Sequence, residues 1–147
     1  MGFVAWQPQE KKELFLAAYH FTITVRGSFE KVVDKTKQAL ADHAFGIVSE
    51  IDMSAVLAEK LGVDQDPYLI LGACNPGFAH EVVAHEPSVG VLLPCNVVVR
   101  AIDDGRVTVD FMDPAVMIGL VGEQKIVALA DEVRTRLEMT RDAIAAA

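Results

Sequence analysis

The stretch Tyr68-Leu-Ile-Leu-Gly-Ala-Cys-Asn-Pro76 contains a strand followed directly by the start of a helix. Its apolar part, Tyr68–Cys74, has the length of a strand and predicts a central strand that is covered on both faces. Asn75 is a favourable helix N-cap, and Pro76 suits the first helical position because it has no N–H group to leave unpaired. The helix is expected to end before Pro87.

Two strand–helix units precede this stretch. Phe21–Val25 alternates apolar and β-branched polar residues, which predicts a half-buried strand, and Ser28 is a favourable N-cap for the helix that follows it. A second strand is expected over Phe45–Asp52. Asp52 or Ser54 can cap a short helix that ends at Gly62 and turns three apolar residues inward: Val56, Leu57 and Leu61.

The chain after Pro87 predicts more strands. Val89–Leu93 and Cys95–Ile102 are expected to form one long strand or two short ones, bent at Pro94. Asp103-Asp104-Gly105 is a hairpin turn signal, and the alternation that follows predicts a partner strand.

The last part of the chain predicts helices. Asp113-Pro114 is expected to begin a helix over about residues 115–120, and the final helix is expected over about residues 123–144. Two pairs of charges on the final helix, Asp131 with Arg134 and Glu132 with Arg136, have the spacing of surface ion pairs. Its core stripe is expected to be Ile126, Ala130, Val133, Leu137 and Ile144.

About five strands interleaved with helices, one hairpin included, predict an α+β fold: a two-layer sandwich with a mixed or mostly antiparallel sheet and helices on one face. The chain has 147 residues, the size of one domain. We expect residues 19–147 to form that domain and residues 1–18 to form an N-terminal arm or a short helix.

Composition excludes several classes of protein. A formal net charge of -8 argues against a nucleic-acid partner, which needs a basic face, and against a polybasic membrane-surface protein. The longest uncharged stretch, Pro87–Val99, is too short to span a bilayer. There is no signal-peptide pattern and there are only two cysteines, so a cytoplasmic protein with reduced thiols is expected.

Two short motifs, Cys74-Asn75-Pro76 and Pro94-Cys95-Asn96, are candidates for chemistry. Their spacing matches neither a redox Cys-x-x-Cys motif nor a zinc ribbon. Each cysteine lies in or at the end of an expected strand. If those strands are neighbours, the thiols can bind a soft metal, form a reversible disulfide or act as nucleophile and resolver. The alternative is that both are buried small apolar residues.

Three other patterns carry weaker signals. His80 and His85 lie five residues apart, roughly 140° around a helix, so they cannot chelate one zinc as a His-Glu-x-x-His motif does. The helix start at Asn75 could bind an anion, but ordinary capping explains it. The third pattern is a set of carboxylates suited to acid–base work or cation binding, in which Asp113 has a simpler role as a cap: Glu86, Asp110 and Asp113.

Leu71-Gly-Ala-Cys-Asn-Pro76, Gly90-Val-Leu-Leu-Pro-Cys-Asn-Val-Val-Val99 and Asp113-Pro114 resemble the domain-of-unknown-function family 302. The resemblance extends from about His20 to the last helix. It implies a small bacterial or archaeal α+β domain that forms a homodimer, with no established activity. One departure is Ala44, where the family usually has glycine, and alanine makes a left-handed helix stop less favourable. The positions that match the family motifs are Cys74, Asn75, Pro76, Pro94, Cys95, Asn96, Asp113 and Pro114.

These observations favour a non-enzymatic, dimeric binding or regulatory module that takes a small molecule or a metal. Its candidate site residues are Cys74, Asn75, Pro76, Cys95, Asn96 and Asp113. A thiol-dependent redox protein or enzyme that uses Cys74 and Cys95 is the first alternative, and a purely structural role for both motifs is the second. No cofactor is indicated.

The acidic charge is unevenly distributed along the chain. Residues 63–122, which hold both Cys-Asn motifs, contain eight acidic residues against two arginines, a net charge of about -6. Such a segment disfavours an anion site at Asn75 and a readily formed thiolate at Cys74. It favours a cation or a neutral small molecule as the ligand.

Overall fold

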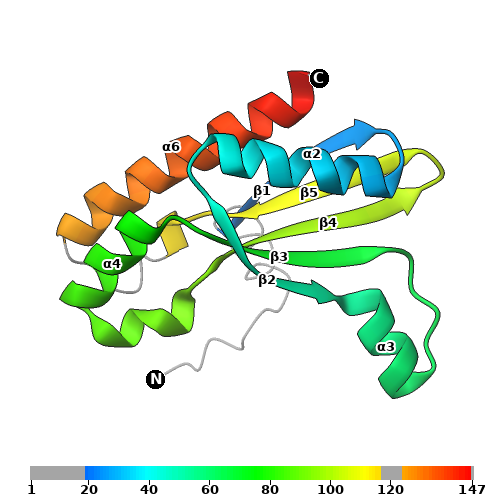
Figure 1. Cartoon of the computed structure of the whole chain (residues 1–147), viewed down its shortest axis with the longest axis horizontal. Coiled ribbons are helices and arrows are strands. Elements are labelled where there is room, and N and C mark those ends of the chain that lie inside the picture. Colours follow the sequence, from blue (N-terminus) through cyan, green and yellow to red (C-terminus); the bar gives the residue numbers. More distant parts are fainter. Residues whose placement is uncertain (1–18, 117–123, 147) are drawn as a thin grey trace, which may run out of the picture.

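The computed structural model describes residues 19–116 and 124–146. Their strands form one sheet in the order β1-β5-β4-β3-β2, and every neighbouring pair is antiparallel. The sheet and its helices form an α+β sandwich, as the sequence predicts (Figure 1). The strands are β1 (His20–Arg26), β2 (Gly46–Asp52), β3 (Tyr68–Cys74), β4 (Cys95–Asp103) and β5 (Arg106–Met112). The helices are α2 (Phe29–Asp42), α3 (Met53–Leu61), α4 (Pro76–His85) and α6 (Gln124–Ala146), with a 3-10 helix η1 (Pro87–Leu92).

The core lies between the sheet and two helices. Figure 1 shows α2 and α6 on the same side of the sheet, which we call the covered face. Because side chains alternate along a strand, every second residue of β4 and β5 points into this core. Val97, Val99, Val109 and Phe111 are fully buried there. The predicted stripe of α6 is confirmed, since its members are all buried: Ile126, Ala130, Val133, Leu137 and Ile144.

Local capping signals are confirmed at three helix starts. The Ser28 hydroxyl accepts a hydrogen bond from the Lys31 amide at 3.3 Å, and the Asp52 carboxylate accepts one from the Ala55 amide at 2.9 Å. Asn75 caps α4 in the same way. These bonds satisfy amide groups that have no partner within the helix, which is why short polar side chains mark helix starts.

The inward orientation predicted for the helix after β2 is wrong. No residue of α3 is buried, and Leu61 is 70% exposed. The helix begins at the Asp52 cap and ends at Gly62, which has a left-handed φ of 63°, as expected. It nevertheless projects from the edge of the sheet beyond β2 and β3 (Figure 1), where no described helix covers its apolar side chains. Short sequence signals thus predict where α3 begins and ends, whereas the burial of its side chains depends on which elements pack against it.

The strand Tyr68–Cys74 is confirmed as an internal strand, but the expectation that both of its faces are covered is wrong. β3 lies next to the edge strand β2, and its core-facing residues Leu71 and Ala73 are fully buried. Tyr68 and Ile70, which point to the opposite side, are only half-buried. The described helices that pack on this sheet form one layer, so a continuous apolar run here does not indicate two covered faces.

A strand over Val89–Leu93 is not formed. Residues Pro87–Leu92 form η1, which begins after Glu86, whose carboxylate accepts from the Ser88 amide. Proline suits the first position of such a turn. Pro94, after a cis peptide bond, directly precedes β4, so the expected bend at proline becomes the junction between η1 and the strand.

Two backbone irregularities lie beside β2. Ala44, between α2 and β2, has a positive φ of 68°, the conformation that glycine adopts most readily. Within β2, Ile47 pairs with Ala73 and Ser49 pairs with Gly72, so Val48 is an extra, bulged residue.

Some expectations lie outside the described residues. They are the arm at residues 1–18 and most of the helix after Pro114, of which the structure describes only Ala115 and Val116. Among the helices that the structure describes, none combines the length and the apolar character needed to cross a membrane.

Candidate functional site

The two cysteines lie at the junction of β3 and β4 but point to different sides of the sheet. The register pairs Ala73 with Cys95, and both side chains are buried on the covered face. Cys74 is the next residue of β3, so its side chain points to the opposite face, and it is only half-buried. Both cysteines are free thiols.

Burial suppresses ionisation of Cys95. Desolvation in the core, and secondarily the nearby Cys74, raise the pKa of the Cys95 thiol to about 12. The thiolate is the form that attacks disulfides and binds metals. Cys95 is therefore a poor nucleophile and a poor metal ligand in the folded protein.

Asn75, Pro76 and Asp113 have structural contacts at the ends of elements. The Asn75 side-chain oxygen accepts from the Phe78 amide at 3.1 Å, and Pro76 is the first residue of α4. The Asp113 carboxylate accepts from the Ala115 amide at 2.9 Å and from the Nε of Arg134 at 3.1 Å. The expected pair of Arg134 with Asp131 is thus replaced by a longer-range one, while Arg136 pairs with Glu132 as predicted.

The six sequence-predicted site residues therefore divide among three places. Cys74, Asn75 and Pro76 form the junction of β3 and α4, and Cys95 and Asp113 belong to the covered side. Asn96 alone among them lines a hollow on the other face of the sheet, which we call the open face.

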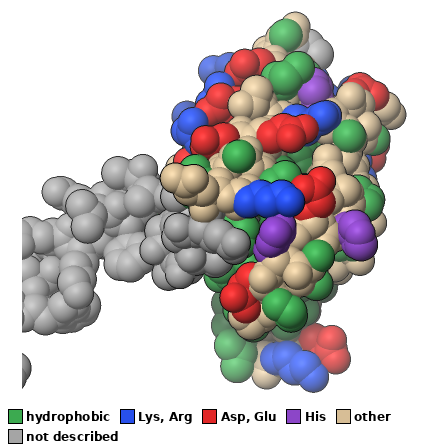
Figure 2. All heavy atoms as spheres, turned by 90° about the vertical axis from the view of Figure 1, so that its left-hand side faces the viewer, with side chains coloured by type: hydrophobic (Ala, Val, Ile, Leu, Met, Phe, Trp, Pro, Cys, Tyr) green, Lys and Arg blue, Asp and Glu red, His purple; other side chains and the backbone are tan. Residues whose placement is uncertain are grey.

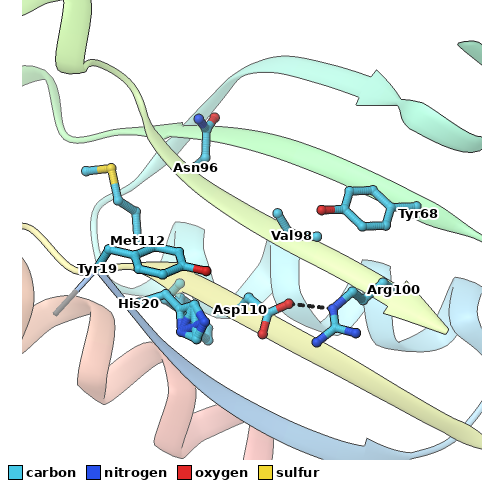
Figure 3. A pocket seen from close by; sticks show the side chains of 9 residues that line it. Tyr19, His20, Tyr68, Asn96, Val98, Arg100, Asp110 and Met112 are labelled. Atoms are coloured by element: carbon cyan, nitrogen blue, oxygen red, sulfur yellow. Dashed lines mark hydrogen bonds and ion pairs between the residues drawn. The ribbon is translucent and has the colours of Figure 1, made fainter. Parts of the chain in front are cut away.

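The hollow on the open face has a volume of about 360 Å³. It spans β3, β4 and β5 and reaches β1, as the side chains drawn in Figure 3 show. Its apolar lining comes from the side chains of Val98 and Met112, while Phe111, which also borders it, has its side chain in the core on the covered face. Its polar lining consists of Tyr19, His20, Tyr68, Asn96, Arg100 and Asp110.

A charged pair lies at one side of the hollow. The Nε of Arg100 donates to Asp110 Oδ2 at 2.7 Å, and the Thr22 hydroxyl donates to Asp110 Oδ1 at 2.7 Å (Figure 3 shows the first of these bonds). The hydrogen bond with Asp110 raises the pKa of Arg100. Asp110 thus has both oxygens engaged, whereas the terminal amino groups of Arg100 bond to none of the described residues.

Three further polar groups face the hollow. The hydroxyl groups of Tyr19 and Tyr68 point toward each other from opposite ends of it (Figure 3). His20 lies near Tyr19, and its Nδ1 is the one buried side-chain nitrogen or oxygen of the described residues with no hydrogen-bond partner. An unpaired buried polar atom costs free energy, so it indicates a position where a partner would be favourable.

Sequence reasoning identified Asn96 and weighed Asp110, but it missed Arg100, Tyr68 and His20 as members of one site. A signal for part of the set was present. The Asp103-Asp104-Gly105 turn fixes the register of the hairpin, which pairs Arg100 with Thr108 and so places Asp110 diagonally across from Arg100 on the same face. Adding β1 and β3 to this pair requires the strand order, which no local signal provides.

No described group of three or more histidine, cysteine, aspartate or glutamate side chains is arranged to hold a metal ion. A second hollow of about 370 Å³ is lined by three aspartates, of which Asp103 is paired with Arg106. The acidic character of residues 63–122 is thus spread over separate places. Asp103, Asp110 and Asp113 each pair with a different arginine.

The charges at the α4 end of the molecule are also mixed. Figure 2 shows acidic and basic side chains of the described residues side by side on this face.

The sequence matches the model of a family described as domain of unknown function DUF302 over residues 21–144. The chain belongs to this family. The DUF302 match includes every strand and helix described here except the first residue of β1 and the last two residues of α6.

A solved structure supports the DUF302 assignment. One neighbour is the crystal structure of an uncharacterised conserved DUF302 protein from Bacillus stearothermophilus, with a TM-score of 0.77 and 26% sequence identity. The similarity covers 85% of this chain and 97% of that one. No curated protein matches the sequence.

Proposed function

We propose that this DUF302 domain is a non-enzymatic binding module that holds a small organic molecule in the hollow on the open face. The observation that carries the proposal is the convergence of unpaired polar groups from several strands on one cavity that also has an apolar lining. Its volume of about 360 Å³ lies at the lower end of the range typical of small-molecule sites.

The site includes Asn96 of the second Cys-Asn motif, which connects the proposal to the sequence pattern. The first motif supports the site indirectly, since Asn75 and Pro76 begin α4 directly after β3. β3 in turn supplies Tyr68 to the hollow. A role as a ligand-responsive regulator follows if binding at the open face changes which partner the domain contacts.

The thiol-dependent alternative has less support. A nucleophile–resolver pair needs two accessible thiols and one easily formed thiolate. Here the Cys95 side chain is 4% exposed, its pKa is raised to about 12, and Cys74 points to the other face of the sheet.

The proposal is tested by titrating the protein with a library of small organic fragments while recording backbone amide NMR spectra. Fragments that bind are expected to shift the amide signals of Asn96, Val98 and Met112. Val98→Trp places a large side chain in the hollow and is expected to abolish these shifts.

The matched control is Val91→Trp, because Val91 is 87% exposed and lies on η1, outside the hollow. Binding should survive in this variant. The proposal fails if no fragment shifts the signals of the open face, or if Val98→Trp binds the same fragments as the unaltered protein.

A further inference from the structure

We infer that the ligand of the open face carries a carboxylate group and that the terminal amino groups of Arg100 bind it. This inference rests on the proposed function and specifies the chemical class of the ligand. It reverses the preference for a cation or a neutral ligand that the acidic segment indicates, because the charge inside the hollow differs from the charge of that segment.

The charged side chains that line the hollow balance each other. Among the described residues that line the hollow, Asp110 is the only acidic one and Arg100 is the only arginine or lysine. Their ion pair leaves the hollow without a net negative charge, although the chain as a whole carries -8. The other carboxylates of the segment are paired or lie elsewhere, so they repel an anion here only weakly across solvent.

The polar groups that line the hollow keep unused hydrogen-bond donors. Asp110 uses one oxygen for Thr22 and the other for the Nε of Arg100. The two terminal amino groups of Arg100 keep their N–H donors, and the side chain is 39% exposed, so they are accessible. Two tyrosine hydroxyls and the Asn96 amide add further donors. A ligand that complements this lining is rich in acceptor oxygens.

The guanidinium group of Arg100 has a geometry that suits a carboxylate. Its terminal nitrogens form a planar fork that matches the two oxygens of a carboxylate, and such charge-assisted pairs are stronger than hydrogen bonds between neutral groups. A neutral amide offers one acceptor oxygen and places an N–H group opposite the second donor. A cation meets the positive charge of Arg100 and no carboxylate oxygen that is free of a partner.

The lining next to Arg100 indicates the rest of the ligand. Val98 precedes Arg100 by two residues on the same face of β4, and Met112 follows Asp110 by two residues on β5. Val98 lies next to the Arg100–Asp110 pair and Met112 lies farther along the same face (Figure 3), so the two provide an apolar surface within the hollow on which a small apolar body can rest. The ligand class is therefore a small carboxylic acid with an apolar body.

Benzoate and benzamide test this inference, because they share size and shape and differ in the carboxylate. Dissociation constants are measured from the same amide NMR shifts. Benzoate is expected to bind at least about tenfold more tightly than benzamide, the effect of one charge-assisted contact. Arg100→Gln should remove this preference. Arg100→Lys, which retains the charge but lacks the fork, should retain only part of it.

Arg106→Gln is the matched control, since Arg106 is also an arginine of the β4–β5 hairpin paired with an aspartate but lies outside the hollow. It should keep the preference for benzoate. The thermal unfolding of all variants shows whether each remains folded.

Equal binding of the two probes, or a preference that survives Arg100→Gln in a folded protein, overturns the inference. If both probes, or fragments of other classes, shift the open-face signals with no preference for the acid, the proposed binding function stands and the carboxylate assignment falls. If neither the probes nor any library fragment shifts those signals, both fall.

Discussion

The covered face of the sheet is apolar along the length of β4 and β5, whereas the open face of the same strands carries Asn96, Arg100 and Asp110 between apolar residues. Successive side chains of each strand point to opposite faces, so one backbone and one register determine which residues lie on each face. On the covered face, the inward side chains of β4 and β5 such as Val97, Val99 and Val109 are fully buried against the helices. On the open face, polar groups partly satisfy one another and leave some donors unused. The core and the proposed binding site thus lie on opposite sides of one sheet.

The sharpest test of the difference between the faces uses the two thiols. A pKa of about 12 for Cys95 against an ordinary value of 9.0 reduces its thiolate fraction at pH 8 roughly a thousandfold. Iodoacetamide is expected to modify Cys74 in the folded protein and Cys95 only after unfolding in urea, which peptide mass spectrometry can follow. Equal labelling of both thiols under native conditions would show that the covered face is not closed at Cys95.

The same substitution at two consecutive residues compares the packing of the faces directly. Val97→Ala is expected to lower the free energy of unfolding by about 2–3 kcal/mol, because Val97 is fully buried and alanine leaves a cavity. Val98→Ala should cost about 1 kcal/mol or less, since Val98 is only half-buried. Urea denaturation measures both values. Comparable losses would mean that the open face is packed as tightly as the covered one.

Gly72 lies on β3 at a place where Ser49 and Pro94 pack closely against the backbone. A Cβ atom at Gly72 would lie 2.1 Å from the Ser49 Oγ and 2.8 Å from the Pro94 Cγ. Gly72→Ala is therefore expected to destabilise the protein by about 1–3 kcal/mol through overpacking. Combining it with Ser49→Gly removes one of the two clashes and should recover part of the loss in the same denaturation experiment. No recovery would place the strain at Pro94 alone.

The smallest effect is expected where the chain passes from the helix layer into the edge of the sheet. Ala44 has a φ of 68°, which costs an alanine about 1 kcal/mol relative to glycine. Ala44→Gly should raise the free energy of unfolding by about that amount, less the extra entropy of glycine in the unfolded chain. A lower melting temperature for this variant would show that the strain is relieved by contacts on the covered face.

Contacts between residues that are close in the sequence could be predicted, whereas contacts between distant segments could not. The caps at Ser28, Asp52 and Asn75 bond to amides three residues away, so a few neighbouring residues suffice to recognise them. The segment Val89–Leu93 is apolar and strand-like, but it pairs with none of the described strands, and the local preference of Pro87 for a helical start prevails. The exposure of α3 likewise depends on which elements lie nearby.

The candidate site shows the same limit. Alternation places Arg100 and Asp110 on one face of a hairpin, and the turn at Gly105 sets their register, so this pair is within reach of sequence reasoning. Tyr68 and His20 join them only because β3 and β1 flank that hairpin, and strand order follows from packing of the whole chain. The Cys-Asn motifs stand out as patterns, yet four of the six residues chosen from the sequence have capping, helix-start or core positions: Asn75, Pro76, Cys95 and Asp113.

The bulge at Val48 has a consequence for how the protein behaves in a crowded solution. β2 is an edge strand, and a flat edge would offer its free amide and carbonyl groups to a strand of another molecule. The extra residue interrupts the regular spacing of those groups, and the strand carries exposed charged side chains, Glu50 in an ion pair with Lys37 and Asp52 at its end. An incoming strand would meet a broken hydrogen-bond ladder and charged side chains. β2 is therefore protected against the edge-to-edge growth that turns a folded sheet into an aggregate.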